Sequence, residues 1–270
     1  MAVAPELIST HIGNVQLRRV GTGNPLVYLH SAGGEGEDLA LFDELAPNYD
    51  VIAPMFPGFG ESEGIEQIDD MEDAVFHLLD LFDRLELSAP AVMGLSLGGW
   101  MAAELATRYP ERISKLILVN PAGLYIEGEE IKDIFSRTPG QMADDLFSDQ
   151  SHPMAKMMHD MGRMMAAGGS SFAVPFETIK PQLQMMAATA RLGWDPYLHN
   201  PKLRKRLHRI TVPTLVVRAT DDTLIPAAHA KAYAQEIPGA KLVEVPNAAH
   251  LVSVERPAEL AAVVTDFLGD

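Results

Sequence analysis

AVMGLSLGGW, residues 91–100, changes midway from a strand pattern to a helix pattern. Its first residues form an apolar run typical of a buried strand, and a helical pattern starts at Leu97. The turn between them, GLSLG, holds Ser96 between two glycines. A serine on so sharp a turn takes a strained backbone conformation, and the flanking glycines leave room for it. The free N–H groups of the following helix would favour an oxyanion beside Ser96. We therefore predict that Ser96 is a nucleophile.

Apolar runs and helical patterns alternate along most of the chain. Several runs are short and continuously apolar, such as LVYLH at residues 26–30, which is typical of strands buried on both faces of a parallel sheet. Such an alternation indicates an α/β fold with crossover helices. We expect strands at residues 15–20, 26–30, 51–54, 91–94, 115–120, 214–218 and 241–245, and helices at 68–85, 97–108, 226–237 and 257–268.

The alternation stops between residues 121 and 210. This stretch is mostly helical in pattern and holds nine of the fourteen methionines. We expect breaks in it at Pro139, Gly168-Gly169, Pro175 and Pro181. An insertion of this size between two strands is typical of a helical cap over a sheet. We therefore predict a core domain of residues 1–120 and 211–270, and a cap of residues 121–210, called the predicted cap below.

The composition is that of a globular protein with an acidic surface. Of the 270 residues 47% are hydrophobic, and the formal net charge is −16. We expect no nucleic-acid partner, because nucleic-acid binding requires Lys and Arg to neutralise phosphates. The one basic stretch, KLRKRLHR at residues 202–209, is expected to be a solvated helix face, and we assign it no function.

Three features of the sequence bear on the location of the protein. No apolar run is long enough to span a bilayer. Residues 1–10, MAVAPELIST, have neither the basic start nor the apolar core of a secretory signal. The chain has no cysteine, which excludes disulfides, thiolate metal sites and cysteine nucleophiles. We expect a cytoplasmic protein that does not enter a membrane.

Five segments of the chain together match a known pattern. They are LVYLHSAGG at 26–34, PGFGES at 57–62, GLSLGGW at 94–100, ATDDTLIP at 219–226 and AAHLVSVERP at 248–257. In this order and at these spacings they resemble the α/β-hydrolase superfamily, and more narrowly its capped esterase- or lipase-like and carbon–carbon-hydrolase-like branches. The resemblance covers nearly the whole chain outside the predicted cap. It implies a mainly parallel eight-stranded sheet flanked by helices, with a helical cap inserted between late strands.

The resemblance also implies an acid and a base for the predicted nucleophile. The family's histidine follows the last strand and precedes a Glu-x-Pro helix start, which matches His250. The family's aspartate stands four residues before a proline, which matches Asp222 in ATDDTLIP. Asp221 then falls on a position that is usually variable and exposed, so we favour Asp222. A serine hydroxyl needs such a base, and the chain order Ser, Asp, His is that of the α/β-hydrolases.

Two backbone amides are expected to form the oxyanion hole. One belongs to Leu97, the residue after the nucleophile, and the other to Ala32 in the loop after strand 26–30. The family usually has His-Gly before the second donor, whereas this chain has His30-Ser31. A backbone donor does not depend on the neighbouring side chain, so we expect the hole to survive. Ser31 either adds a hydroxyl or packs, and His30 is expected to brace the loop.

Six methionines in the predicted cap repeat at the spacing of one helix face. They are Met154, Met157, Met158, Met161, Met164 and Met165. Two interpretations stay open, core packing under the cap or an adaptable apolar wall over the site, for which the flexible methionine side chain is suited. For a wall, we expect Met158 and Met165 to contact substrate. Arg191 and Trp194 are further candidates, and Arg191 would pair with an anionic substrate group, because the protein as a whole repels anions.

The preferred function is cleavage of a carboxylic ester. Ser96 would attack a small to medium, largely apolar substrate and form an acyl-enzyme, which water activated by His250 would hydrolyse. One alternative is a carbon–carbon bond hydrolase for vinylogous diketone acids of the meta-cleavage type, which would depend on a cationic cap residue. Another is a receptor-like member of the superfamily that binds a ligand without turnover.

Other chemistries of the fold are disfavoured. Epoxide hydrolases and haloalkane dehalogenases use an aspartate nucleophile, and Ser96 stands in its place. No metal or cofactor is implied, because the chain has no His-Glu-x-x-His, no cysteine cluster and no phosphate loop. A small-molecule substrate is the one partner that we expect, and the sequence leaves its identity and the oligomeric state open.

Overall fold

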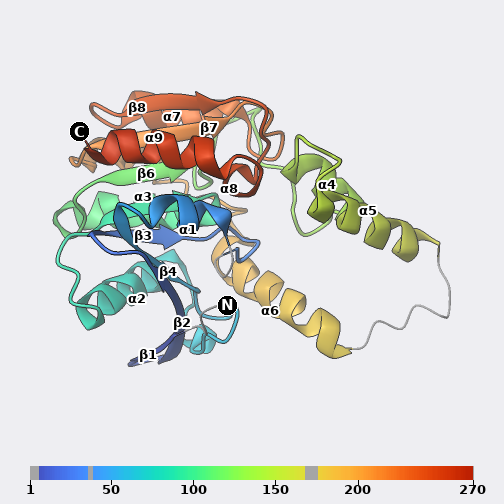
Figure 1. Cartoon of the computed structure of the whole chain (residues 1–270), viewed down its shortest axis with the longest axis horizontal. Coiled ribbons are helices and arrows are strands. Elements are labelled where there is room, and N and C mark those ends of the chain that lie inside the picture. Colours follow the sequence, from blue (N-terminus) through green and yellow to red (C-terminus); the bar gives the residue numbers. More distant parts are fainter. Residues whose placement is uncertain (1–5, 36–38, 168–175, 270) are drawn as a thin grey trace.

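The computed structural model describes residues 6–35, 39–167 and 176–269. Eight strands form one sheet in the order β1-β2-β4-β3-β5-β6-β7-β8 (Figure 1). Neighbouring strands from β4 to β8 are parallel, and β2 pairs antiparallel with both β1 and β4. The strands are β1 (Glu6–Thr10), β2 (Gly13–Val20), β3 (Asn24–Leu29), β4 (Tyr49–Pro54), β5 (Ala91–Leu95), β6 (Leu116–Val119), β7 (Thr214–Ala219) and β8 (Lys241–Val245).

This topology confirms the predicted α/β fold with a mainly parallel sheet of eight strands. Seven of the strands coincide with the apolar runs in the sequence. The apolar pattern missed β1, although the family resemblance implied an eighth strand. Its sequence, ELIST, lies at the edge of the sheet and is largely exposed, so it needs no continuous apolar run.

Helices cover both faces of the sheet. In the central strands, alternate side chains enter different cores: Val92 of β5 belongs to one buried cluster, and Met93 and Leu95 belong to the other. This double burial is the reason for the unbroken apolar runs. The helices are α1 (Ala40–Leu45), α2 (Met71–Arg84), α3 (Leu97–Arg108), α4 (Pro139–Leu146), α5 (Pro153–Ala166), α6 (Phe176–Gly193), α7 (Ala227–Glu236), α8 (Val252–Glu255) and α9 (Pro257–Gly269), with 3₁₀ turns η1 (Ile65–Gln67), η2 (Pro110–Arg112) and η3 (Arg204–Arg209).

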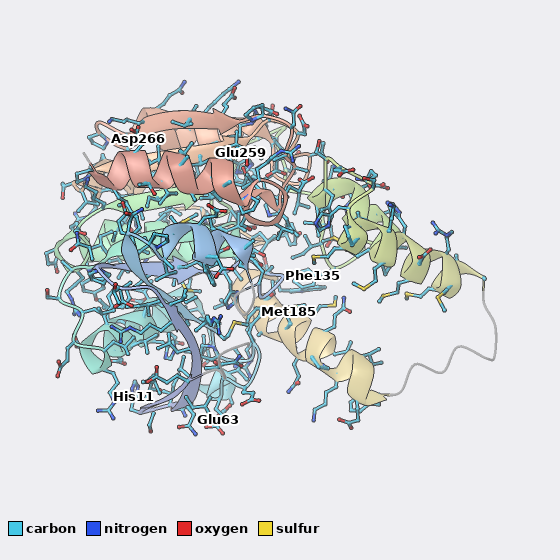
Figure 2. All side chains as sticks on the ribbon, viewed as in Figure 1. His11, Glu63, Phe135, Met185, Glu259 and Asp266 are labelled. Atoms are coloured by element: carbon cyan, nitrogen blue, oxygen red, sulfur yellow. The ribbon has the colours of Figure 1, made fainter. Side chains whose placement is uncertain are left out.

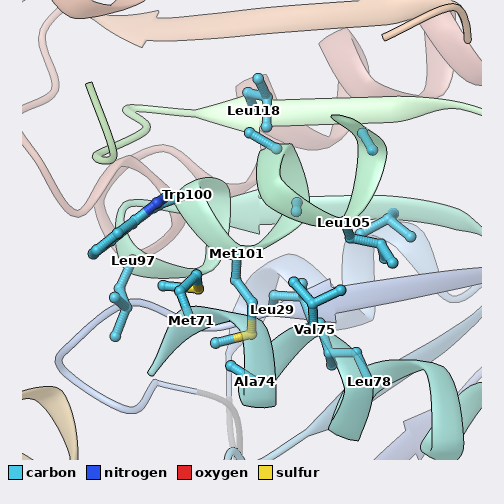
Figure 3. Packing of buried hydrophobic residues seen from close by; sticks show 14 of the residues in the cluster. Leu29, Met71, Ala74, Val75, Leu78, Leu97, Trp100, Met101, Leu105 and Leu118 are labelled. Atoms are coloured by element: carbon cyan, nitrogen blue, oxygen red, sulfur yellow. The ribbon is translucent and has the colours of Figure 1, made fainter. Parts of the chain in front are cut away.

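The packing of α2 against α3 fixes the helix that follows Ser96. Trp100, Met101 and Leu105 of α3 belong to one buried cluster with Val75 and Leu78 of α2 (Figure 3). Asp70 caps the start of α2, since its side chain accepts hydrogen bonds from two backbone N–H groups of the first turn. Because α3 is buried along its length, its N-terminus has a defined position relative to the sheet.

Between β6 and β7 the chain forms α4, α5, α6 and η3. Figure 1 shows α5 and α6 extending away from the sheet on the same side. The predicted break at Pro139 is the first residue of α4, where proline is favoured. The predicted break at Pro181 is wrong, because α6 continues through it. A proline this near the start removes one backbone hydrogen bond, which a helix of eighteen residues tolerates. The remaining predicted breaks, Gly168-Gly169 and Pro175, lie outside the described residues.

The basic stretch 202–209 lies in and just before η3. Leu203 and Leu207 are fully buried in the cluster that contains α3, while Lys205 and His208 are exposed. The charges therefore cover the outside of a segment that is anchored by its leucines, as expected for a solvated face.

Candidate active site

Ser96 occupies the turn between β5 and α3 with φ 55° and ψ −111°. A positive φ is uncommon outside glycine and marks a strained backbone. Gly94 and Gly98 are required because other backbone atoms come too close to them to leave room for a Cβ atom. A Cβ added to Gly94 would lie 2.2 Å from the carbonyl oxygen of Gly98, and one added to Gly98 would lie 2.1 Å from the carbonyl oxygen of Leu29. The turn thus has the strained, glycine-flanked form that the sequence pattern predicts.

Backbone hydrogen bonds hold this strained residue in place. The N–H of Ser96 donates to the carbonyl oxygen of Val119 on β6 at 2.9 Å. Its own carbonyl oxygen accepts from the N–H groups of Trp100 at 3.0 Å and Ala122 at 3.1 Å. Ser96 is 7% exposed. Its position is therefore set by the neighbouring strand and by α3 together.

Asp222 and His250 meet although they come from different loops, those after β7 and β8. The Nδ1 atom of His250 lies 2.8 Å from Oδ2 of Asp222, and both side chains are buried. The other carboxylate oxygen of Asp222 accepts the N–H groups of Leu224 at 2.9 Å and Ile225 at 3.0 Å. Because a carboxylate that is held in this way is an acceptor, it assigns the proton of His250 to Nδ1 and leaves Nε2 free to accept a proton.

The adjacent Asp221 points to different partners. Its carboxylate accepts hydrogen bonds from the hydroxyl groups of Ser148 at 2.6 Å and Thr220 at 2.9 Å. These hydrogen bonds lower the pKa of Asp221. Of the two neighbouring aspartates, the structure therefore brings Asp222 to His250 and directs Asp221 toward the predicted cap.

Ser96 and His250 are connected through the residue that follows β6. Asn120 comes directly after Val119, the hydrogen-bond partner of the Ser96 N–H. Its side-chain Nδ2 donates to the carbonyl oxygen of His250 at 3.0 Å, and its Oδ1 accepts from the N–H of Ala219 at 2.9 Å. Within the described residues, Ser96 Oγ itself makes no hydrogen bond to His250. No periodicity or motif in the sequence singles out Asn120.

The loop after β3 is organised around Ser31 and Glu35. The hydroxyl of Ser31 donates to Glu35 at 2.5 Å and accepts the N–H of Gly33 at 2.9 Å. The backbone N–H of Ser31 also donates to Glu35, at 2.8 Å. The N–H of Gly34 donates to the Ser31 carbonyl oxygen at 3.0 Å. The Ser31 hydroxyl thus supports the loop internally, and Glu35 is a contributor that sequence reasoning missed.

These bonds leave one amide of the loop available. Among residues 31–34, the N–H of Ala32 makes no hydrogen bond to any described residue, whereas the other three are engaged. The N–H of Leu97 is likewise available, because the first amides of a helix have no intrahelical partner. Both predicted oxyanion donors are therefore free to donate, Ala32 as the unbonded amide among residues 31–34 and Leu97 as one of the first-turn amides of α3.

His30 links the loop after β3 to the loop after β4. Its Nε2 accepts the N–H of Phe56 at 2.9 Å, and its Nδ1 lies 2.7 Å from the carbonyl oxygen of Ser31. Both ring nitrogens are thus engaged, and burial lowers the pKa of His30. A neutral histidine with both nitrogens occupied braces the loop, as the sequence led us to expect.

The predicted substrate-contacting residues of the predicted cap are largely exposed or bonded to other residues. All six methionines of the stripe lie on α5, where Met158 is partly buried and the others are 37–58% exposed, Met165 most of all. Arg191 donates to the carbonyl oxygen of Ile68 at 3.0 Å and pairs with Asp69 at 3.3 Å. Trp194 is 64% exposed. Whether any of them contacts substrate stays a prediction.

Met185 is a better-placed residue of α6 that we did not single out. A Cβ added to Gly34 would lie 3.2 Å from the sulfur of Met185, so this side chain rests on the loop that contains Ala32. In Figure 2, Met185 of α6 and Phe135 are labelled close to each other beside α6. Met185 is also partly buried and packed against the core.

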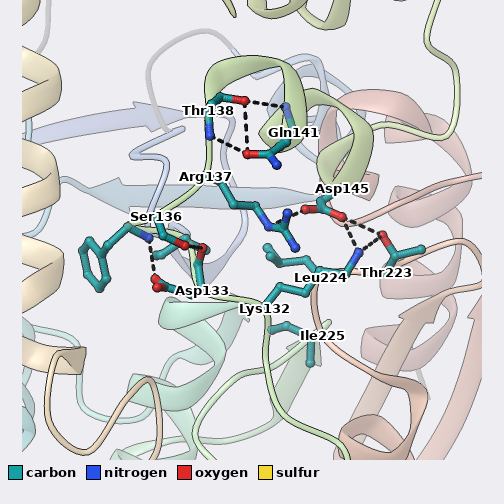
Figure 4. A network of polar contacts seen from close by, with 12 residues as sticks. Lys132, Asp133, Ser136, Arg137, Thr138, Gln141, Asp145, Thr223, Leu224 and Ile225 are labelled. Carbon is teal, nitrogen blue, oxygen red and sulfur yellow. Dashed lines mark hydrogen bonds and ion pairs between the residues drawn. The ribbon is translucent and has the colours of Figure 1, made fainter.

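A polar network around the buried Asp145 joins the predicted cap to the loop of Asp222. Asp145 of α4 forms ion pairs with Lys132 and with Arg137, the latter at 2.7 Å. Thr223, the residue after Asp222, donates to Asp145 at 3.0 Å and accepts from Lys132 at 3.0 Å (Figure 4). The start of the predicted cap is thus connected to the residue next to the predicted acid.

Glu255 makes a corresponding connection to the loop of His250. One carboxylate oxygen accepts the N–H of Ala249 at 2.7 Å, and the other accepts the N–H groups of Ser148 and Asp149 at 2.9 Å each. Glu255 therefore ties the residue before His250 to the segment between α4 and α5.

Two kinds of site are not found in the described ranges. No group of three or more His, Cys, Asp or Glu side chains there is arranged to hold a metal ion. None of the helices in those ranges has both the length and the apolarity for crossing a bilayer.

Comparison with known proteins adds sequence evidence. A family model described as alpha/beta hydrolase fold matches residues 24–257. Among solved structures, that of a bacterial membrane phospholipase A has a TM-score of 0.79 at 20% identity, covering 99% of this chain and 86% of that one. At this identity the likeness shows the shared fold.

Three curated relatives align over most of this chain. A dihydrolipoyllysine-residue acetyltransferase component of the acetoin cleaving system from Pseudomonas putida is 29% identical over 91% of this chain, which spans 64% of that relative's length. The 2-hydroxymuconate semialdehyde hydrolase of Pseudomonas sp. (strain CF600) is 27% identical, with 99% and 94% of the two chains covered. A pimeloyl-[acyl-carrier protein] methyl ester esterase from Aeromonas hydrophila is 26% identical, with 95% and 100% covered.

Proposed function

This chain belongs to the alpha/beta hydrolase fold family, and we propose that it is a serine hydrolase that cleaves a carboxylic ester of a small to medium, largely apolar substrate. One observation carries the proposal: a buried Asp222–His250 pair, 2.8 Å apart, lies on loops that leave the same edge of the sheet as the strained turn of Ser96. An aspartate, a histidine and a serine on three such loops supply the groups that nucleophilic acyl transfer requires.

The chemistry follows from the roles of these groups. Ser96 Oγ attacks the ester carbonyl carbon while His250 Nε2 takes its proton. Asp222 holds the opposite ring nitrogen and stabilises the imidazolium that forms. The N–H groups of Ala32 and Leu97 donate hydrogen bonds to the developing oxyanion. His250 then protonates the leaving alcohol, and a water molecule activated by the same nitrogen hydrolyses the acyl-enzyme.

The surroundings favour an ester as the substrate. Arg191, the candidate partner for an anionic substrate, bonds to Ile68 and Asp69, so an anionic substrate would have to displace Asp69 whereas a neutral ester would not. Met185 lies against the loop of Ala32 and offers an apolar surface there. A relative that aligns over its full length is named a methyl ester esterase, which supports the same class of bond.

A carbon–carbon bond hydrolase is the second candidate. It is supported by the relative named 2-hydroxymuconate semialdehyde hydrolase, which aligns over 94% of its length. The ion pair between Arg191 and Asp69 is solvent-exposed, at 41% and 86% for the two side chains. An exposed pair contributes only about 0–1 kcal/mol, so a substrate carboxylate can compete with Asp69 for Arg191. Substitution Arg191→Gln would then impair turnover of a dienoate acid and spare neutral esters.

The deciding experiment combines a covalent probe with a substrate panel. A fluorophosphonate probe should label the protein, and Ser96→Ala should abolish both labelling and hydrolysis of p-nitrophenyl esters, with a loss in kcat of about 10⁴–10⁶-fold. Ser62→Ala is the matched control, because Ser62 is similarly buried at 8% but its hydroxyl bonds to the backbone of Met55 and Gln16. A labelled protein without turnover would support the receptor-like alternative, and turnover of a dienoate but no ester would support the second candidate.

We also propose that the protein is cytoplasmic and that its partner is its small-molecule substrate. The absence of cysteine from the sequence supports a reducing compartment. Cell fractionation with an antibody to the chain tests the location, and recovery in a membrane or secreted fraction would contradict it.

A further inference from the structure

Asn120 occupies a restricted position between the loops of the proposed site. It follows β6 directly, and its side chain is 2% exposed. Its φ is 40°, in the left-handed region that asparagine, aspartate and glycine tolerate and that most other residues avoid. The backbone is held there by the bond from its own N–H to the carbonyl oxygen of Val217 at 2.9 Å.

The two ends of the Asn120 amide serve different loops. The Oδ1 atom accepts the N–H of Ala219, at the end of β7 and three residues before Asp222. The Nδ2 atom donates to the carbonyl oxygen of His250, 130 residues away along the chain. One buried side chain therefore connects the strand that leads to the predicted acid with the backbone of the predicted base.

Two other contacts hold the residues before and after His250. Ala249 donates to Glu255, and Leu251 donates to the carbonyl oxygen of Leu146 in the predicted cap. The bond from Asn120 holds the backbone of His250 itself from the sheet side. Since Asn120 also follows the hydrogen-bond partner of the Ser96 N–H, it connects the base to the strand next to the nucleophile.

We propose that Asn120 is a positioning residue, which sets the imidazole of His250 relative to Ser96 by holding the His250 carbonyl oxygen while it fixes the end of β7. Asparagine meets both demands, because it offers an acceptor and a donor on one short side chain and tolerates the positive φ. Aspartate keeps the acceptor and lacks the donor. Glycine tolerates the positive φ and lacks both the acceptor and the donor. This inference rests on the proposed function, since it concerns the same site.

The test uses Asn120→Gly and Asn120→Asp, two substitutions that leave the backbone conformation accessible. Both should lower kcat about 100-fold, the size of effect that a small misplacement of a reacting group produces. KM for the best p-nitrophenyl ester should change little, because Asn120 is buried and both ends of its amide are bonded to backbone groups. Asn200→Gly is the matched control, since Asn200 bonds to Glu104 at 2.7 Å, away from the site, and should lose stability without a specific loss in kcat.

A second measurement does not depend on turnover. The proton on Nδ1 of His250, shared with Asp222, should give a downfield proton NMR resonance, and Asn120→Gly should weaken or shift it while the melting temperature stays within the range of Asn200→Gly. The inference would be overturned if both Asn120 variants kept the wild-type kcat. It would also be overturned if kcat fell only in proportion to a loss of stability while the resonance stayed unchanged. If Asn120→Gly does not fold, Asn120→Asp decides. If the wild type labels with no probe and cleaves no substrate, the proposed function fails, and the resonance alone decides the role of Asn120.

Discussion

Asp222 holds His250 with one carboxylate oxygen and its own loop with the other. Oδ2 lies 2.8 Å from Nδ1 of His250, and Oδ1 accepts two backbone N–H groups from Leu224 and Ile225. A carboxylate anchored at both oxygens cannot rotate away from the histidine without breaking several bonds. The orientation of His250 therefore depends on the loop after β7 as much as on the loop that carries it.

Single substitutions of Asp222 and of Asp221 test whether the orientation of His250 depends on Asp222. Asp222→Asn should lower kcat roughly 10⁴-fold, because the amide no longer selects the Nδ1–H form of His250. Asp221→Asn should change kcat only slightly, since Asp221 bonds to Ser148 and Thr220 and makes no contact with His250. The measurement is kcat on a p-nitrophenyl ester, with circular dichroism to check folding. A larger loss in Asp221→Asn would show that the other aspartate is the acid.

The methionines of α5 allow a test of the predicted cap. If they line an apolar pocket when substrate is bound, truncation of one that contacts substrate removes roughly 1–3 kcal/mol, and kcat/KM for a medium-chain ester falls about 10–200-fold. An acetate ester, which need not reach that wall, should be affected far less. Met158→Ala and Met165→Ala should be compared separately, because Met158 is partly buried and Met165 is 58% exposed. Equal losses on both esters with a lower melting temperature would mean that the residue only packs.

The ion pairs of Asp145 should contribute to stability. Its side chain is 5% exposed and faces Lys132 and Arg137, which are 36% and 23% exposed. Asp145→Asn should cost about 1–2 kcal/mol, less than for a fully buried pair because both cations keep contact with water. For a chain of this size the melting temperature should fall by about 2–8 °C. Asp144→Asn, on the same helix and 65% exposed, is the control and should change the melting temperature little.

A buried histidine predicts a dependence of stability on pH. His77 is 3% exposed, and burial lowers its pKa to about 4. In the unfolded chain a histidine has a pKa of about 6.5, so as the pH falls below that value the unfolded state binds a proton and the folded state does not. Stability should therefore decrease as the pH falls from about 6.5 to about 4, by about 2 kcal/mol at pH 5.

Urea unfolding of the wild type and His77→Phe at pH 7 and pH 5 measures this effect. Phenylalanine keeps a ring at the position, which contacts Phe56 edge to face, and it removes the titration. The difference in unfolding free energy between the two pH values should be about 2 kcal/mol smaller in the variant. His208→Gln, at an exposed histidine, is the control. An equal pH dependence in wild type and His77→Phe would contradict the assignment to His77.

The sequence alone was enough for features that depend on neighbouring residues. The glycines of the turn lie two residues to either side of Ser96. The need for Gly94 is local, because a Cβ there would meet the backbone of Gly98, whereas the need for Gly98 arises from the backbone of Leu29 on β3. The continuous apolar runs were similarly informative, since burial on both faces requires them. The apolar pattern did not reveal the edge strand β1, because β1 is largely exposed and needs no continuous apolar run.

Features that join distant parts of the chain depended on the tertiary structure. A resemblance to known hydrolases indicated His250 and Asp222, but no sequence signal marked Asn120, Glu35 or Glu255. The bond between Asn120 and His250 spans 130 residues, and it exists because the order of the sheet brings the ends of β6, β7 and β8 to one edge. The sequence also left undetermined what the α5 methionines contact, because that depends on how α5 packs against distant parts of the chain. The spacing of a helix face is set by local geometry, whereas its partner is chosen by the packing of the whole chain.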